Sequence, residues 1–281
     1  MEQLNRVRRS GRTLIVAAVL AVVALLIPLG LGGLASADPS QGDGPHPTIV
    51  LVHGDWADGS SWRGVIERLQ RRGFTVVAPP NPLRGPTSDA ADLARFLQTI
   101  PGPIVLAAHS YGGFVATNAA TGNANVRALV YIDAFIPDVG QTLVDLAAGS
   151  CVDASTSFNA VPLPGGVVDL YLRSEANPPY PGFSECFANG VKPDRAAVLA
   201  AVQRPAALNQ YGEPSGPPAW ATIPSWSLIG TEDRVIPPDQ QHAMSTNAGA
   251  QISTVDAGHL SLITRPNVVT DLIETAVDAT L

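Results

Sequence analysis

Basic residues are scarce in this sequence, and several other features are missing altogether. Among 281 residues, 17 Lys and Arg stand against 24 Asp and Glu, so the formal net charge is −7. An acidic chain is a poor partner for nucleic acid or for an anionic membrane. The absence of internal repeats and heptads excludes a repeat array and a coiled coil. Only two cysteines occur, and neither lies near the N-terminus, which argues against a lipoprotein anchor.

The first 37 residues have the pattern of a secretory signal peptide. A segment with four arginines precedes an uncharged run from Thr13 to Ala37, which ends in an A-x-A cleavage site. Cleavage before Asp38 would leave 13 basic and 23 acidic residues and place the protein in the medium or the cell envelope. The alternative is a retained membrane anchor, because the run is long enough to cross a bilayer. A proline and several glycines within the run weaken that alternative.

Residues 38–281 are expected to form one domain, in which short apolar runs alternate with amphipathic stretches. This alternation predicts an α/β fold, with about six mainly parallel strands covered by helices on both faces. The expected strands are 48–52, 75–78, 104–107, 128–132, 225–229 and 252–255. The expected helices are 61–72, 90–98, 114–120, 239–247 and 268–280. Ser60 or Ser61 would cap the first helix, and Gly73 would end it.

The alternation fails between residues 137 and 220, where Pro, Gly, Asn and Ser become frequent. Segments such as VPLPGG, ANPPYPGF and YGEPSGPPAW interrupt any regular pattern. A stretch this long inside a compact domain is usually functional. We therefore expect residues 137–220 to form an inserted cap, or lid, over the edge of the sheet.

Ser110 lies between an apolar, strand-like run and two glycines in the stretch VLAAHSYGGF. A strand that ends near Ala107 and a helix that begins near Gly112 would put this serine on a sharp turn, the nucleophile elbow. Gly112 would let the helix approach the neighbouring backbone closely. Ala108 stands where the G-x-S-x-G pattern has its first glycine. The serine can act as a nucleophile only if an imidazole and a carboxylate activate it.

The partners of Ser110 are expected in the order acid, then histidine, each just after a strand. His259 follows the last strand in ISTVDAGHLSL, and Glu232 and Asp233 follow the previous strand in WSLIGTEDRVIPP. Asp233 is favoured because it lies further beyond the strand, where a loop can turn its side chain inward. Asp133, after the strand in ALVYID, is the alternative acid.

The stretch TIVLVHGDWADGSSW predicts a buried strand that ends at His53 and a loop that begins at Asp55. An oxyanion hole needs two backbone N–H groups, one from this early loop and one after the nucleophile. Asp55 and Tyr111 are the residues in these places. The Asp55 carboxylate should then turn toward solvent or the neighbouring loop.

Three further histidines are expected to lie outside the site. His46 is close to the N-terminus of the mature chain, and His242 lies on a helix, so both should be solvated. His109 precedes the nucleophile directly and should point away from it.

Four segments together resemble the α/β-hydrolases, in particular the branch that holds plant methylesterases and hydroxynitrile lyases. They are LVHGDWADGSSW, AHSYGG, GTEDRVIP and AGHLSLITRP, spread in family order over the region from Thr48 to the C-terminus. The resemblance implies a triad of Ser110, Asp233 and His259, with the backbone N–H groups of Asp55 and Tyr111 as the oxyanion hole. It implies no metal and no organic cofactor.

These observations predict a serine esterase. His259 would take the proton of Ser110, the serine would attack an ester carbonyl, and water would then free the acyl group from the acyl-enzyme. Few residues of the expected cap are charged, which favours a small to medium, mainly apolar ester or lactone as substrate. Aromatic residues would line the pocket, drawn from Trp56, Tyr111, Phe135, Tyr180 and Phe183.

Two other functions remain open at this point. A lyase or a cofactor-free perhydrolase could use the same triad, and a ligand-binding protein could keep the pocket without catalysis. In the related hydroxynitrile lyases a lysine follows the base, whereas Leu260 follows it here and offers no charge. Arg234 is expected on the surface and does not replace that lysine. We therefore expect no cleavage of cyanohydrins.

Cys151 and Cys186 both lie in the expected cap. An exported protein meets an oxidising compartment, so we expect the two to form a disulfide. Closing this loop would stabilise the fold by roughly 3 to 4 kcal/mol in the chain-entropy model, mainly by ordering the cap.

Overall fold

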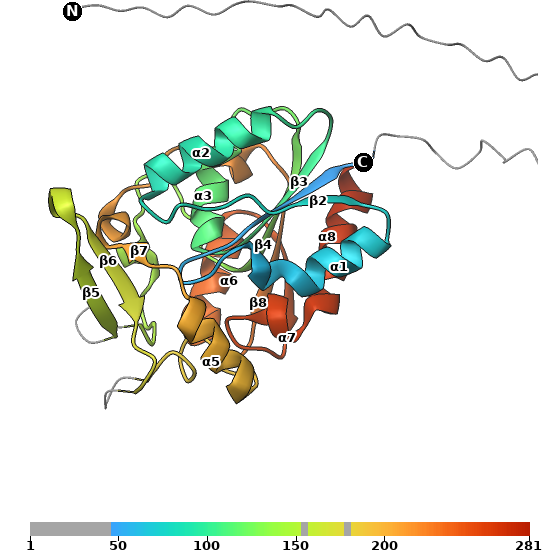
Figure 1. The fold of residues 1–281 in the computed structure, drawn as a ribbon. Helices are drawn as coiled ribbons and strands as arrows, with labels where there is room; N and C mark the ends of the chain where they lie inside the picture. Colours follow the sequence, from blue (N-terminus) through green and yellow to red (C-terminus); the bar gives the residue numbers. More distant parts are fainter. Residues whose placement is uncertain (1–45, 153–156, 177–180) are drawn as a thin grey trace, which may run out of the picture. The chain divides into compact units, whose positions relative to one another are not determined.

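Six parallel strands form the central sheet in the computed structural model of this chain (Figure 1), which describes residues 46–152, 157–176 and 181–281. The strands are β1 Thr48–Val52, β2 Thr75–Val77, β3 Ile104–Ser110, β4 Val126–Ala134, β8 Ser225–Gly230 and β9 Gln251–Val255. Their order across the sheet is β2-β1-β3-β4-β8-β9, and each neighbouring pair is parallel. The predicted α/β fold with about six mainly parallel strands is confirmed.

Helices cover both faces of this sheet, which explains why its central strands are apolar throughout. Every residue of β3 is buried. On one face lie α1 Arg63–Arg71 and α8 Pro266–Thr280, and on the other lie α2 Pro86–Gln98 and α3 Tyr111–Ala119 (Figure 1). Helix α6 Pro238–Asn247 packs on β8 and β9, and the short helix α7 Ser261–Thr264 contacts α1 and α8.

Several helices begin earlier than their apolar pattern predicted. α2, α6 and α8 each have a proline in the first turn, where the missing N–H and the fixed φ are tolerated. The segment before α1 begins as a 3-10 turn, Gly59–Trp62, and its cap is Asp58 and not Ser60 or Ser61. The Asp58 carboxylate accepts the Ser60 N–H at 2.7 Å. Gly73 follows this helix as predicted, with a φ of 89°.

Residues 137–220, which we call the insert, lie between β4 and β8 and hold more regular structure than their composition predicted. Strands β5 Phe158–Pro162, β6 Val168–Leu172 and β7 Ala206–Ala207 form a second, antiparallel sheet. The insert also contains α4 Leu143–Leu146, α5 Pro193–Val202 and the 3-10 turns η2 Pro164–Gly166 and η3 Leu208–Gly212, and it ends within the 3-10 turn η4 Ala219–Ala221. Its glycines serve the turns: Gly165 and Gly166 both have positive φ at the tip of the β5–β6 hairpin.

The expected signal peptide, residues 1–37, lies outside the described residues. Tyr180, one of the expected pocket residues, lies outside them as well. Within residues 46–152, 157–176 and 181–281, no helix is both long and apolar enough to cross a membrane.

Candidate active site

Ser110 is the last residue of β3, and α3 begins at Tyr111, so the serine occupies the turn between them. Its φ of 53° and ψ of −128° lie in a region that residues other than glycine rarely adopt. Gly112 permits the close approach of the helix, because a Cβ there would lie 2.7 Å from the carbonyl oxygen of Val52. The strand reaches Ser110 and does not stop at Ala107, so the turn is tighter than predicted.

His259, in the loop after β9, links Ser110 to Asp233. Its Nε2 lies 3.0 Å from Ser110 Oγ, and its Nδ1 lies 2.8 Å from Asp233 Oδ2. Asp233 lies in the turn after β8, where its Oδ1 accepts the N–H groups of Val235 and Ile236 at 2.8 and 3.0 Å. The structure thus brings the three predicted residues into one relay. A proton on Nδ1 satisfies the carboxylate and leaves Nε2 to accept the serine proton.

The three residues of this relay are buried. His259 is fully buried, and Ser110 and Asp233 are 2% and 4% exposed. Burial lowers the pKa of His259 to about 3, so the imidazole is neutral near pH 7 and can act as a general base. Burial raises the pKa of Asp233, and two backbone N–H groups and the Gln241 amide, 2.7 Å from Oδ2, oppose that rise.

Asp133, the alternative acid, has a different place. Its two carboxyl oxygens accept the N–H groups of Gly230 and Ser261 at 2.8 and 3.1 Å. It therefore joins the end of β8 to the start of α7, and it makes no hydrogen bond to the imidazole. Burial and the charge of Asp233 raise the pKa of Asp133 well above its ordinary value. Glu232 is exposed, so the geometry selects Asp233 as the acid.

The two expected oxyanion donors, the N–H groups of Asp55 and Tyr111, belong to backbone segments that lie in contact. A Cβ added to Gly54 would lie 2.6 Å from Ser110 Cβ and 3.1 Å from Tyr111 N. The N–H of Tyr111 lies in the first turn of α3, where N–H groups have no partner within their own helix. The Asp55 side chain does not face solvent: it is 4% exposed and accepts a hydrogen bond from Gln210 of the insert at 2.6 Å.

A cavity of about 160 Å³ opens onto Ser110, and the insert supplies much of its wall. Trp56 and Phe135 line it, as the sequence predicted. Tyr111 and Phe183 do not: the Tyr111 hydroxyl donates to Asp89 at 2.8 Å, and Phe183 packs against Phe187. The remaining lining residues are Asp55, Leu143, Val144, Ala147, Ser150, Val152, Phe158, Tyr211 and Val235.

The prediction for His109 was wrong. Its Nε2 lies 2.9 Å from the carbonyl oxygen of His259, and the centres of the two rings are 4.7 Å apart. His109 is buried because β3 is central, so it supports the base and does not turn away from the site. His46 and His242 are exposed, as expected.

Two residues of the insert also hold the base, and sequence reasoning missed them. The Phe187 ring lies 5.3 Å from the His259 ring. Asn189 donates its amide to the carbonyl oxygen of Glu232 at 2.8 Å and accepts the His259 N–H at 3.4 Å. No motif marks them, because their positions depend on how the insert folds.

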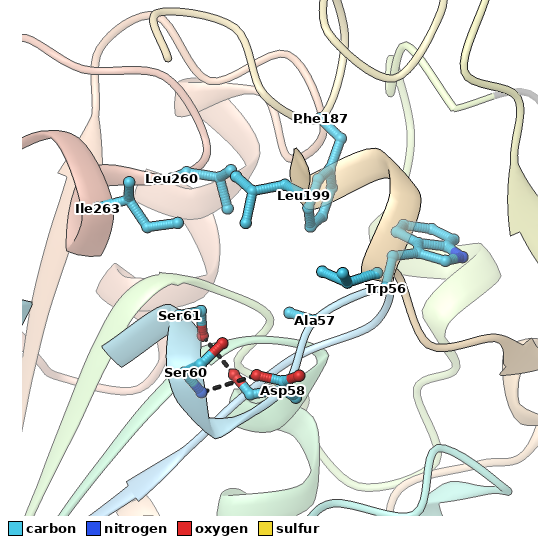
Figure 2. Close-up of a pocket in the computed structure, with 10 residues that line it drawn as sticks. Trp56, Ala57, Asp58, Ser60, Ser61, Phe187, Leu199, Leu260 and Ile263 are labelled. Carbon is cyan, nitrogen blue, oxygen red and sulfur yellow. Dashed lines mark hydrogen bonds between the residues drawn. The ribbon is translucent and has the colours of Figure 1, made fainter. Parts of the chain in front are cut away.

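Leu260, next to the base, does not line the Ser110 cavity. Its side chain lies with Trp56, Phe187, Leu199 and Ile263 around a separate cavity of about 20 Å³ (Figure 2). It is 1% exposed, and the polar residues Asp58, Ser60 and Ser61 line the same small cavity. Arg234 is exposed, as expected.

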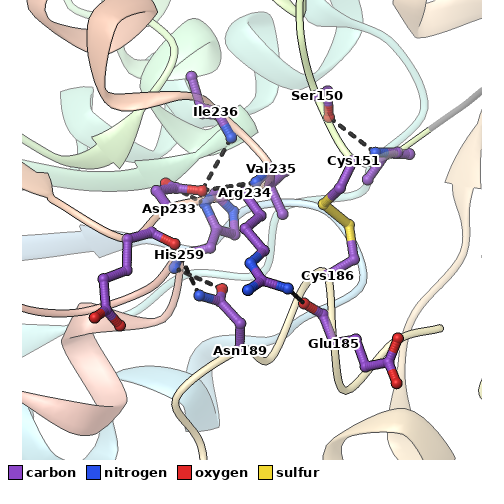
Figure 3. The surroundings of a disulfide bond; sticks show 12 residues. Ser150, Cys151, Glu185, Cys186, Asn189, Asp233, Arg234, Val235, Ile236 and His259 are labelled. Atoms are coloured by element: carbon purple, nitrogen blue, oxygen red, sulfur yellow. Dashed lines mark hydrogen bonds and ion pairs between the residues drawn. A yellow bond between two sulfur atoms is a disulfide. The ribbon is translucent and has the colours of Figure 1, made fainter. Parts of the chain in front are cut away.

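Cys151 and Cys186 form a disulfide with a Cα–Cα distance of 5.8 Å. The bridge lies beside the loop that carries Asp233 (Figure 3). The Cys151 N–H donates to the carbonyl oxygen of Arg234 at 2.8 Å, and Arg234 Nη1 donates to the carbonyl oxygen of Glu185 at 3.3 Å. Both ends of the bridge therefore touch the segment next to the acid.

Over residues 49–272 the chain matches the sequence model of the alpha/beta hydrolase family. The chain belongs to that family. This alpha/beta hydrolase is 33% identical over 111 residues to the carbendazim hydrolyzing esterase of Nocardioides sp. (strain SG-4G), a match that covers 35% of the chain and 46% of that esterase. Among the described residues, no group of His, Cys, Asp and Glu side chains is arranged to hold a metal ion.

Solved structures of esterases share the fold of this alpha/beta hydrolase. A variant of polyneuridine aldehyde esterase superposes with a TM-score of 0.66 at 17% identity, covering 82% of this chain and 98% of the other. A methylesterase from Arabidopsis gives a TM-score of 0.62 at 16% identity, covering 83% and 99%. The likeness to the methylesterase branch, expected from the four motifs, is confirmed at the level of the fold.

Proposed function

We propose that this protein is an exported serine esterase that hydrolyses small to medium, mainly apolar carboxylic esters through an acyl-enzyme. The observation that carries this function is the buried relay from Asp233 through His259 to Ser110, at the floor of a mainly apolar cavity. The esterase names among the relatives support the reaction class.

The reaction takes two acyl-transfer steps. Neutral His259 accepts the Ser110 proton as Oγ attacks the ester carbonyl, and the carbonyl oxygen becomes an oxyanion facing the N–H groups of Asp55 and Tyr111. His259 then gives its proton to the alcohol, which leaves. Water then enters, loses a proton to His259 and attacks the acyl carbon. The bond from that carbon to Ser110 Oγ breaks, His259 returns its proton to Oγ, and the acyl group leaves as a carboxylic acid.

A labelled fluorophosphonate tests the nucleophile, and p-nitrophenyl esters of graded acyl length test the reaction. Ser110 should carry the label, and Ser110→Ala should lose it together with at least about a thousandfold in kcat/KM. Ser150→Ala is the matched control, because Ser150 lines the same cavity without a base and its loss should leave the label on Ser110. An unlabelled Ser110 in folded protein would contradict the proposed function.

A further inference from the structure

Asp55 and Tyr211 place two polar groups in the otherwise mainly apolar wall of the Ser110 cavity. One carboxyl oxygen of Asp55, Oδ2, accepts the Gln210 amide at 2.6 Å. The other oxygen, Oδ1, and the Tyr211 hydroxyl are buried, and neither makes a hydrogen bond within the described part of the chain. We call these two side chains the polar wall.

Arg84 acts on the Asp55 carboxyl only from a distance, and its charge lowers the pKa of that carboxyl. Among the described residues no Lys or Arg forms an ion pair with it, and Arg84 turns to Asp169 and to the carbonyl oxygen of Pro205. Burial raises the pKa of Asp55 to about 7, the Gln210 amide opposes this, and the charge of Asp89 adds to it. A large share of Asp55 is therefore ionised near neutral pH.

The Tyr211 hydroxyl remains neutral in the same place. Burial raises the pKa of Tyr211 well above its ordinary value, and the neighbouring Asp55 charge adds to the rise. The Gln210 side chain opposes that rise, although it makes no hydrogen bond of normal geometry with the hydroxyl. The polar wall thus offers an acceptor at Asp55 and a group at Tyr211 that both donates and accepts.

A buried polar atom without a partner destabilises the folded state. Such atoms have a use in the wall of an apolar cavity, because a few fixed polar groups orient a small molecule there. Asp55 Oδ1 lacks a donor, so the complementary ligand group carries an O–H or N–H. A purely apolar ester would leave this atom unpaired.

The position of Asp55 limits where that group lies on the ligand. The Asp55 N–H is one of the two expected oxyanion donors, and the carboxyl belongs to the same residue. A ligand whose carbonyl oxygen meets this N–H can therefore reach the carboxyl only with atoms close to the carbonyl carbon. Within the acyl group, the α carbon is the position nearest to the carbonyl carbon that can carry such a group.

We infer that Asp55 and Tyr211 bind an O–H or N–H group on the α carbon of the acyl part of the substrate. Esters with an α-hydroxy or α-amino substituent are then preferred, a preference that presupposes the esterase activity proposed above. Asp55 thereby becomes a specificity-determining residue in addition to its backbone role. The apolar wall would hold the remainder of the acyl group.

Binding to Ser110→Ala measures this preference without turnover. The probes are methyl mandelate, methyl phenylglycinate, methyl 2-phenylpropanoate and methyl phenylacetate, which carry a hydroxyl, an amine, a methyl and a hydrogen on the same carbon. Titration calorimetry should show the hydroxy or amino ester binding about tenfold or more tightly than the methyl ester. The two donor esters distinguish an O–H from an N–H ligand. Equal binding of all four, or binding of none, overturns the inference.

Two substitutions in the Ser110→Ala background locate the preference. Asp55→Ala should reduce the ratio of hydroxy-ester to methyl-ester affinity to near one, and Tyr211→Phe should reduce it in part. Val144→Ala is the matched control, since it trims the same cavity without removing a polar atom and should leave the ratio unchanged. If the ratio of hydroxy-ester to methyl-ester affinity is unchanged in the Asp55→Ala variant, the proposed role of Asp55 is contradicted.

Hydrolysis by the natural sequence separates this inference from the proposed function. If the natural protein hydrolyses the methyl and hydroxy esters at equal kcat/KM, the esterase stands and the preference fails. If it hydrolyses none while Ser110→Ala binds the hydroxy ester more tightly, the polar wall stands and the esterase fails. For the natural protein, the preference for the hydroxy ester should increase as the pH rises through about 7, because Asp55 is a stronger acceptor when ionised.

Discussion

At the scale of single residues, the burial of His259 makes a prediction about pH. Burial lowers the pKa of His259 to about 3, and only the neutral imidazole accepts the Ser110 proton. Activity should therefore be lost only as the pH falls through this low value, far below the ordinary histidine pKa of about 6.5. We expect kcat/KM for an ester without a hydrogen-bond donor to stay level from about pH 6 down to pH 4, which lies below the raised pKa values of Asp233 and Asp55. An acid limb centred near pH 6.5 would contradict this.

Leu260 gives a second prediction at the same scale. Leu260→Lys would place an ammonium beside the apolar side chains of Trp56, Phe187 and Ile263, in a small cavity that Asp58 also lines and that is separate from the Ser110 cavity. We expect it to lower the free energy of unfolding by about 3 kcal/mol and to reduce ester turnover through the neighbouring base. Urea unfolding measures the first effect.

The control for that change is Leu260→Met, which keeps the apolar volume and should cost less than about 1.5 kcal/mol. The lysine side chain would point away from Ser110, so Leu260→Lys should release no cyanide from mandelonitrile. Cyanide release from that variant or from the natural protein would contradict the placement of residue 260 outside the Ser110 cavity and the expectation that cyanohydrins are not cleaved.

At the scale of elements, the sequence could predict those residues of the site whose positions are set by the parallel strands. Ser110 ends β3, Asp233 follows β8 and His259 follows β9, and parallel strands present their carboxyl ends at one edge of the sheet. The sequence order alone therefore places them together. The contact of Asp55 with Gln210 could not be predicted in this way, since it joins residues 155 positions apart and depends on the fold of the insert.

The disulfide allows a prediction for the insert. Changing both Cys151 and Cys186 to serine should lower the free energy of unfolding by roughly 3 kcal/mol and reduce kcat/KM, because the bridge lies against the Asp233 loop. Arg234→Ala is the control: it removes the side-chain link to Glu185 and leaves the bridge intact. Denatured, unreduced protein should contain no free thiol, and a titration that finds two would contradict the pairing.

At the scale of the whole molecule, we propose that the chain is exported and begins at Asp38 after cleavage. A basic segment, an apolar run and the A-x-A site support export, and a disulfide persists in an oxidising compartment. Expressed with its own N-terminus, the protein should appear in the medium or the envelope fraction, with an intact mass that lacks residues 1–37. Ala35→Leu with Ala37→Leu should block cleavage and leave the chain in the membrane fraction, whereas the control Ala24→Leu should not. If the natural chain is found uncleaved in the membrane fraction, cleavage before Asp38 is contradicted. The apolar run is then retained as an anchor, and the esterase domain stays at the membrane.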